Sequence, residues 1–151
     1  MSSSRLPGKM LMNIGDKTVI QHLVDRLREC STLDDIVIAT TINPADDVLI
    51  EWAESYGVKT FRGSEDDVLQ RVIDANKFMT ADIIVEITGD CPFTDPDIID
   101  IGVNTFLNNE IDYLTNCEIP STPPGLYVQV FRLDSLIKIG NLIKVLENYE
   151  I

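Results

Sequence analysis

The sequence has few of the residues that build zinc or disulfide sites. It contains three cysteines and one histidine in 151 residues. Cys30, Cys91 and Cys117 lie far apart, and no two of them form a Cys-x-x-Cys pair. An odd number of cysteines at such spacing indicates neither a zinc site nor a disulfide framework.

Basic residues are also scarce. The chain has 12 lysines and arginines against 25 aspartates and glutamates, which gives a formal net charge of -13. This charge argues against nucleic acid or an anionic membrane as a general partner. An anionic ligand would need a local basic site or a bridging metal, and the many carboxylates make divalent cations natural partners.

Long hydrophobic runs are missing as well. Residues 1–17 contain no apolar stretch of signal-peptide length, and no run approaches the length of a membrane span. No internal repeat is visible. We expect a cytoplasmic protein with one domain over residues 1–151, which is long enough to bury a core. Residues 119–125, with three prolines, predict an extended loop or a hinge into a second lobe.

What the sequence does have is a regular alternation of helix and strand patterns. Apolar residues at helical spacing predict helices over 18–29, 45–56, 65–78, 95–108 and 133–149. Short apolar or β-branched runs predict strands at 36–41, 58–61, 82–88, 113–115 and 127–131. Asp67 is expected to cap the third helix. The alternation predicts an α/β fold with a mostly parallel sheet covered by helices on both faces.

In such a sheet, ligands bind at the carboxyl ends of the strands. This rule selects one candidate surface, formed by the pairs Thr40-Thr41, Arg62-Gly63 and Gly89-Asp90.

The first residues form a short, polar and basic loop with the sequence SSSRLPGK at positions 2–9. Arg5 can fork onto phosphate oxygens, and Lys9 can act on them as a point charge. The backbone around Ser3 and Ser4 can turn N–H groups toward the same anion. The alternative interpretation is a solvated N-terminus without a ligand.

Four separated motifs together resemble the cytidylyltransferases that make CMP-activated sugar acids, most closely the branch named after spore-coat polysaccharide biosynthesis. The motifs lie at residues 1–9, 38–47, 61–69 and 87–92. The likeness covers the chain to about residue 131. It implies a three-layer, Rossmann-like nucleotide-diphospho-sugar transferase fold. It also implies transfer of CMP from CTP to a sugar acid or related sugar in cell-surface polysaccharide biosynthesis, and a homodimer.

The resemblance assigns roles to individual residues. Arg5 and Lys9 would contact the β- and γ-phosphates of CTP, and Asp90 would hold Mg²⁺ together with phosphate oxygens. The nucleotide side of the site would be lined by Ser3, Ser4, Thr40, Thr41, Arg62 and Gly89.

Each of these residues also has a structural interpretation. Asp90 suits a turn in Gly-Asp-Cys-Pro, and hydroxyls such as those of Thr40 and Thr41 are common at strand ends. Arg62 suits an ion pair with the acidic residues 65–67. A weaker alternative makes Asp90 the phospho-acceptor of a signalling domain.

The departures from the family pattern are as specific as the matches. Ser2 replaces a glycine, and Tyr127 and Gln129 stand where the family has acids. The family's first strand and a closing segment with a second acidic ligand are not found in residues 1–151. We therefore expect a domain that is incomplete at both ends, with an open position in its sheet. The alternative function is a non-catalytic, nucleotide-binding remnant of the family.

Overall fold

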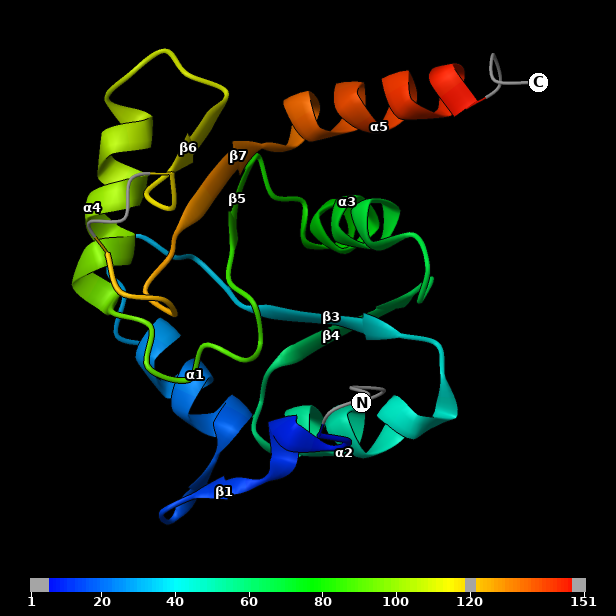
Figure 1. The fold of residues 1–151 in the computed structure, drawn as a ribbon, viewed down its shortest axis with the longest axis vertical. Helices are drawn as coiled ribbons and strands as arrows, with labels where there is room; N and C mark the ends of the chain where they lie inside the picture. The colour runs from blue at the N-terminus through cyan, green and yellow to red at the C-terminus, as the bar shows by residue number, and fades with distance from the viewer. Residues whose placement is uncertain (1–5, 119–121, 148–151) are drawn as a thin grey trace.

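The fold is that of a computed structural model, which describes residues 6–118 and 122–147 (Figure 1). Its helices are α1 Val19–Leu27, α2 Asp47–Ser55, α3 Val68–Met79, α4 Pro96–Leu107 and α5 Leu133–Glu147, with short 3-10 helices η1 Lys9–Leu11 and η2 Pro44–Asp46. Its strands are β1 Asn13–Ile14, β2 Lys17–Thr18, β3 Val37–Thr41, β4 Lys59–Gly63, β5 Ile83–Glu86, β6 Tyr113–Thr115 and β7 Gln129–Arg132. The expected α/β class is confirmed, and each expected helix and strand has its counterpart. The end of the last expected helix at 148–149 and the first part of the expected hinge at 119–121 lie outside the described residues.

Side-chain caps fix where several helices begin. The Thr18 hydroxyl and the Asp67 and Asp95 carboxylates accept hydrogen bonds from backbone N–H groups in the first turns of α1, α3 and α4. Such caps satisfy donors that have no partner inside the helix. Asp67 is the predicted cap of α3, and it accepts the N–H of Gln70 at 2.8 Å.

The strands form two separate main sheets. β3 and β4 pair in parallel, and β5, β7 and β6 pair antiparallel in that order. β1 and β2 form a small hairpin that the sequence patterns do not predict. Within residues 6–118 and 122–147, β3–β4 is the one parallel ladder. The expected continuous sheet is therefore divided between β3 and β5, because no strand among the described residues lies between them.

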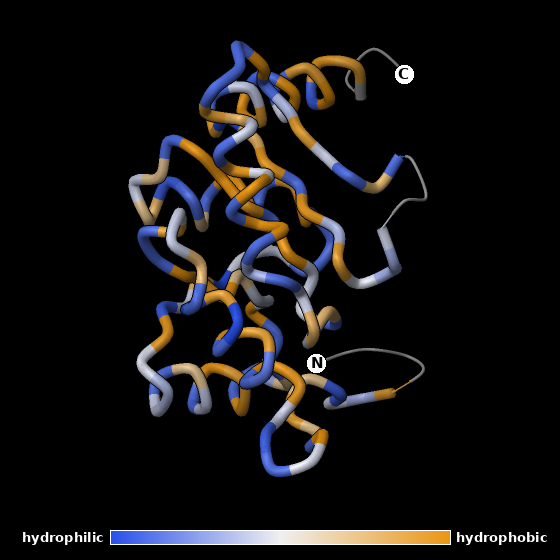
Figure 2. Tube along the Cα trace, turned by 90° about the vertical axis from the view of Figure 1, so that its left-hand side faces the viewer, coloured by the Kyte–Doolittle hydropathy of each residue, from blue (hydrophilic) through white to orange (hydrophobic). Residues whose placement is uncertain are grey.

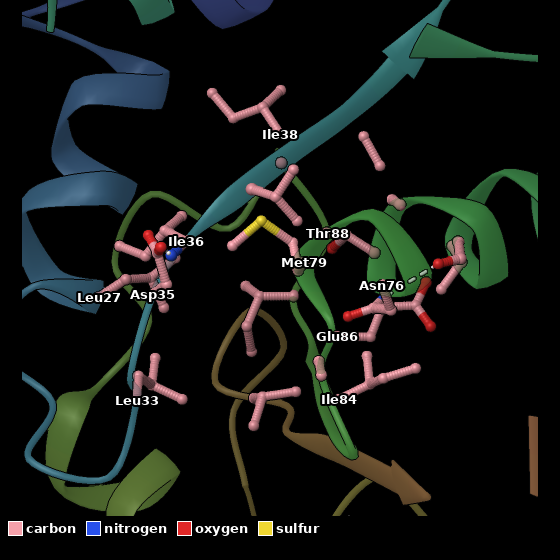
Figure 3. A pocket seen from close by; sticks show the side chains of 18 of the residues that line it. Leu27, Leu33, Asp35, Ile36, Ile38, Asn76, Met79, Ile84, Glu86 and Thr88 are labelled. Carbon is pink, nitrogen blue, oxygen red and sulfur yellow. Dashed lines mark hydrogen bonds between the residues drawn. The ribbon is translucent and has the colours of Figure 1, made fainter. Parts of the chain in front are cut away.

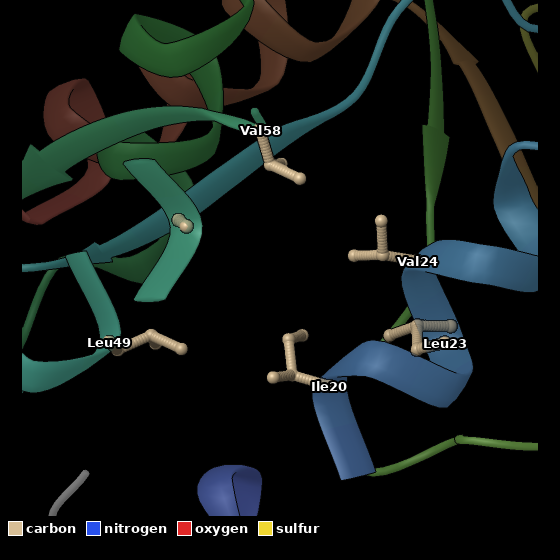
Figure 4. Close-up of a cluster of buried hydrophobic side chains, with 6 residues drawn as sticks. Ile20, Leu23, Val24, Leu49 and Val58 are labelled. Atoms are coloured by element: carbon tan, nitrogen blue, oxygen red, sulfur yellow. The ribbon is translucent and has the colours of Figure 1, made fainter. Parts of the chain in front are cut away.

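Helices cover both sides of the β3–β4 pair. In Figure 1, α3 lies on one side of this pair and α2 lies on the other. α1 and α2 enclose a core cluster to which Ile20, Leu23, Val24, Leu49 and Val58 contribute (Figure 4). A second cluster joins α4 to β7 through Ile99, Phe106 and Val130, and a third joins α3, β5 and α5. In Figure 2 hydrophobic segments run through the middle of the molecule, and others lie in α5, where Ile139, Leu142 and Leu146 are exposed.

Asp100 on α4 ties down the segment that follows α1. Its carboxylate accepts hydrogen bonds from the backbone N–H and hydroxyl groups of Ser31 and Thr32, at 2.6 to 3.0 Å. These bonds, led by that from the Thr32 hydroxyl, lower the pKa of Asp100 to about 2. A carboxyl group with a lowered pKa stabilises the fold above its unfolded pKa, and this contribution is lost as the pH falls through its folded pKa.

We expect Asp100→Ala to lower the free energy of unfolding at pH 6, where the carboxylate is ionised. The difference from the wild type should shrink between about pH 4 and pH 2. Urea titrations across this range measure it. Asp97→Ala, on the exposed first turn of the same helix, is the control. A deficit for Asp100→Ala that stays constant down to pH 2 contradicts the assignment.

Candidate functional site

Lys9 and Asp90 meet although they lie 81 residues apart in the sequence. Lys9 begins η1, and Asp90 lies in the turn that follows β5. Lys9 Nζ donates to Asp90 Oδ2 at 2.7 Å, and the two side chains keep 33% and 54% of their surface exposed. The bond from Lys9 is the main reason that the pKa of Asp90 lies below its ordinary value. Asp90 is therefore ionised at neutral pH and accessible to solvent.

Two glycines allow η1 to approach this turn. Gly8 precedes η1 with a φ of 72°, in the left-handed region that favours glycine. Gly89 faces Met10, and a Cβ at position 89 would lie 2.4 Å from Met10 Cε and 3.2 Å from its Sδ. The N–H of Cys91 closes the turn by donating to the carbonyl of Thr88 at 3.0 Å. Small residues at 8 and 89 thus bring the cation and the carboxylate together.

Thr40 and Thr41, at the end of β3, are held by the carboxylate of Asp46. Their hydroxyls donate to Asp46 Oδ2 at 2.6 and 2.7 Å, and the N–H of Thr41 donates to the same oxygen at 3.1 Å. Asp46 is almost fully buried. Burial alone raises its pKa, but the hydrogen bonds it accepts, those from both threonines among them, lower the pKa well below its ordinary value. In this conformation the hydrogen bonds of both hydroxyls stabilise the loop that leads from β3 into α2.

Arg62 braces the same loop from β4. Its guanidinium donates to the carbonyl oxygens of Thr41 and Asn43, both at 2.9 Å, and pairs with Asp47 Oδ1 at 2.7 Å. The expected structural partner, the acidic segment 65–67, is thus replaced by Asp47. Arg62 lies at the same sheet end as Thr41, as the register of β3 and β4 requires.

A cavity of about 920 Å³ separates β3 from β5 (Figure 3). Lys9, Met10, Thr40, Gly89 and Asp90 line it together with many apolar side chains. The structure therefore brings Lys9, Thr40, Gly89 and Asp90 to one cavity. Glu86 also lines it, and burial raises the pKa of this carboxyl group.

Three of the expected phosphate ligands lie outside the described residues. These are Arg5, Ser3 and Ser4. Among the expected phosphate ligands of the N-terminal loop, Lys9 is therefore the one whose position the described residues include.

The carboxylate of Asp90 suits a metal ion that binds together with a phosphate-containing ligand. Within the described ranges, no three His, Cys, Asp or Glu side chains gather into a metal-binding group. Mg²⁺ commonly binds proteins through one or two carboxylates and takes its other ligands from substrate phosphates and water. Asp90, ionised and exposed, suits that mode of binding.

Sequence patterns did not identify Asp46, Asp47 and Met10 as residues that position the site. Asp46 and Asp47 belong to the motif at 38–47, but their contacts depend on the path of the loop.

His22 is expected on a helix surface or at an interface, and a nitrogen of its ring forms a hydrogen bond with the carbonyl oxygen of Ile14 at 2.8 Å. Across residues 6–118 and 122–147, no helix has both the length and the apolar character that crossing a bilayer requires.

Comparison with known proteins gives consistent matches. The model of the cytidylyltransferase family matches residues 1–139. The protein MJ1063 of Methanocaldococcus jannaschii is 43% identical over 136 residues, which cover 90% of this chain and 55% of that protein. The spore coat polysaccharide biosynthesis protein SpsF of Bacillus subtilis is 32% identical over 154 residues, covering 99% of this chain and 63% of its own length.

A solved cytidylyltransferase from Leptospira borgpetersenii superposes with a TM-score of 0.89 at 40% identity, over 93% of this chain and 60% of that chain. The chain thus spans between 55 and 63% of the length of these three relatives.

Proposed function

The chain belongs to the cytidylyltransferase family, and from this premise we propose that it takes part in the transfer of CMP from CTP to a sugar acid or a related sugar. The observation that carries the proposal is the contact between Lys9 and Asp90. It brings a lysine, a cation of the kind that binds phosphate, and an aspartate, a carboxylate of the kind that binds metal, from two family motifs to the lining of one cavity.

In this reaction a hydroxyl oxygen of the sugar attacks the α-phosphorus of CTP. The bond from that phosphorus to the bridging oxygen of the β-phosphate breaks, pyrophosphate leaves, and the attacking hydroxyl loses its proton. Catalysis of such a step depends mainly on positioning and on neutralising charge. Lys9 and Arg5 bind the β- and γ-phosphates in this proposal. Asp90 would hold Mg²⁺, and the bound metal would supply further positive charge to the phosphates.

Thr40, Thr41 and Arg62 have a positioning role in the proposed site. The Thr41 hydroxyl donates to Asp46 and accepts the N–H of Asn43 at 3.1 Å, so both of its functions are occupied. Arg62 holds two carbonyls of the same loop. We assign these three residues to shaping the loop beside the nucleotide, with Gly89, Ser3 and Ser4 nearest the phosphates.

Calorimetric titration of CTP into the chain, with and without MgCl₂ and with ATP as the competing nucleotide, tests the proposal. We expect binding that requires Mg²⁺ and prefers CTP. Failure of the folded protein to bind CTP, or equal affinity for ATP, overturns it.

A second candidate is a nucleotide-binding protein without catalytic activity. It is favoured by Gln129, an uncharged residue at a position where the family has an acid; its side-chain oxygen accepts the hydroxyl of Tyr113 at 3.1 Å. Release of pyrophosphate from CTP, with a panel of sugar acids as acceptors, distinguishes the two candidates. The sugar, the cytoplasmic location, the role in polysaccharide biosynthesis and the homodimer stay predictions.

Gly89→Ala is expected to weaken Mg²⁺-dependent CTP binding. The new Cβ would lie 2.4 Å from Met10 Cε, the flexible end of that side chain, so the Met10 side chain must change its conformation beside Lys9 and Asp90. Met10→Ala removes the colliding atoms, and the double variant Gly89→Ala/Met10→Ala should regain most of the affinity. Titration of the three variants measures both effects. If the double variant binds no better than Gly89→Ala, the collision with Met10 is not the cause.

A further inference from the structure

We propose that Arg71 is a positioning residue of the nucleotide site, which holds the loop between β4 and α3 in the conformation that binds CTP. This role rests on the proposed function, because it concerns the same site. Arg71 lines the cavity that Lys9 and Asp90 also line. Three features carry the role: the contacts of Arg71 with residues 63–65, the place of this loop at the carboxyl end of the sheet, and a second arginine at the opposite end of β4.

The guanidinium of Arg71 closes the loop that joins β4 to α3. Arg71 lies in the first turn of α3, and its Nη1 donates to the carbonyl oxygen of Ser64 and, at 3.5 Å, to that of Glu65. Both carbonyls lie between Gly63, the last residue of β4, and Val68, the first residue of α3. Hydrogen bonds from a charged donor are stronger than those between neutral groups. One side chain therefore holds two successive peptide groups of the loop.

Gly63 allows the Arg71 side chain to lie close against the end of β4. A Cβ at position 63 would lie 2.8 Å from Arg71 Cγ and 3.1 Å from Arg71 Cβ. Both atoms belong to the part of the side chain nearest the backbone of α3, so they cannot swing aside as the far end of a long side chain can. The absence of a side chain at 63 thus keeps the guanidinium within reach of the loop carbonyls.

The loop lies at the end of the sheet where the candidate site is. Gly63 pairs with Thr41 in the parallel register, so residues 63–67 and the loop after β3 leave the sheet at the same end. The side-chain amide of Asn43 donates to Glu65 Oε2 at 3.2 Å and joins the two loops. Ligands of open α/β sheets bind at this end. The shape of residues 63–67 therefore helps to determine the surface that a nucleotide meets.

Arg28 makes the same kind of contact at the opposite end of β4. Its Nη2 donates to the carbonyl oxygens of Tyr56 and Gly57, at 2.8 and 3.4 Å. These two residues precede β4, which begins at Lys59. Arg28 thus holds the segment before the strand, whereas Arg71 holds the segment after it. If both arginines only stabilised the fold, the loss of either would have the same effect on CTP binding.

Calorimetric titration of CTP, in the presence of MgCl₂, into Arg71→Met, Arg71→Lys and Arg28→Met tests the role. Methionine keeps an apolar stem and removes the donors, so Arg71→Met should bind CTP about tenfold more weakly than the wild type. Lysine can still donate to both carbonyls, and Arg71→Lys should regain most of the affinity. Arg28→Met should bind CTP like the wild type, even where its melting temperature falls as far as that of Arg71→Met. Equal affinities of Arg71→Met and Arg28→Met overturn the proposal. An Arg71→Lys chain that binds as weakly as Arg71→Met also overturns it, since the guanidinium would then act on the nucleotide itself.

The wild-type chain separates this role from the proposed function. Failure of the wild type to bind CTP overturns both, whereas normal binding by the wild type and by Arg71→Met overturns the role of Arg71 alone. Amide exchange of the wild type decides the matter if a variant does not fold. Saturation with CTP and MgCl₂ should slow exchange by about tenfold at residues 64–67 and leave residues 56–58 unchanged. Equal protection of both segments, or protection of neither, overturns the proposal.

Discussion

Replacing Asp90 by alanine is expected to abolish the effect of Mg²⁺ on CTP and to lower pyrophosphate release by about 100-fold or more. The reason is that Asp90 supplies the ionised carboxylate that pairs with Lys9 in the lining of the cavity. Without it, the proposed Mg²⁺ would have no carboxylate to bind on the protein, and CTP affinity should become equal with and without the metal. Calorimetric titration measures the affinities, and a coupled pyrophosphate assay measures turnover.

The loss should not arise from unfolding. The pair of Lys9 and Asp90 is partly exposed, and such pairs contribute at most about 1 kcal/mol to stability. The melting temperature of Asp90→Ala should therefore stay near that of the wild type. Asp66→Ala is the matched control. Asp66 is exposed, and its side chain has no hydrogen bond or ion pair with residues 6–118 and 122–147. An Asp90→Ala chain that keeps its metal-dependent affinity for CTP refutes the metal-binding role.

The sequence predicts the secondary structure well because its signals are local. Helices show apolar residues at a spacing of three and four, and strands show short apolar runs. The start of α3 was predicted at residue 65 but lies at Val68, since Asp67 caps the helix and the Ser64 hydroxyl accepts the N–H of Asp67. The hairpin of β1 and β2 was not predicted because strands of two residues carry no periodic signal.

The site is predictable only where a motif marks it. Lys9 and Asp90 belong to separate motifs, and the family resemblance assigns both to the same nucleotide site, whereas the rule that ligands bind at strand ends selects Asp90 without Lys9. The role of Asp46 is different, because its contacts with Thr40 and Thr41 depend on how the loop after β3 folds back. A carboxylate beside Asn43 and Pro44 suggests a helix cap from the sequence alone. Burial and three hydrogen bonds to one oxygen appear only in three dimensions.

The division of the sheet links stability to the proposed site. The composition of β3 and β5 indicates strands with neighbours on both sides, yet each has one paired neighbour among the described residues. The buried side chains that join helices to each half of the sheet form the core clusters described above. Small domains have a net stability of only about 5–15 kcal/mol, so one core residue is a large share of it.

Phe106→Ala is accordingly expected to lower the free energy of unfolding by about 3–5 kcal/mol. Phe106 is 0% exposed and packs in the cluster that joins α4 to β7 through Ile99 and Val130. Truncation to alanine removes the ring and leaves a cavity that a rigid helix–sheet contact cannot fill. Urea denaturation followed by the fluorescence of Trp52, which lies in α2, reports whether the rest of the domain unfolds together with α4.

Two further variants provide reference values for the destabilisation by Phe106→Ala. Ile101→Ala changes a residue of the same helix that is 65% exposed, and its effect should stay within about 0.5 kcal/mol. Phe106→Leu keeps an apolar side chain of smaller size and should fall between the other two, which preserves the comparison if the alanine variant does not fold. Only residues 91–95 lie between Asp90 and the start of α4. Phe106→Leu should therefore also weaken CTP binding at urea concentrations at which α4 begins to unfold. If Phe106→Leu and Ile101→Ala have the same stability, the contact between α4 and β7 does not hold the second half of the sheet in place.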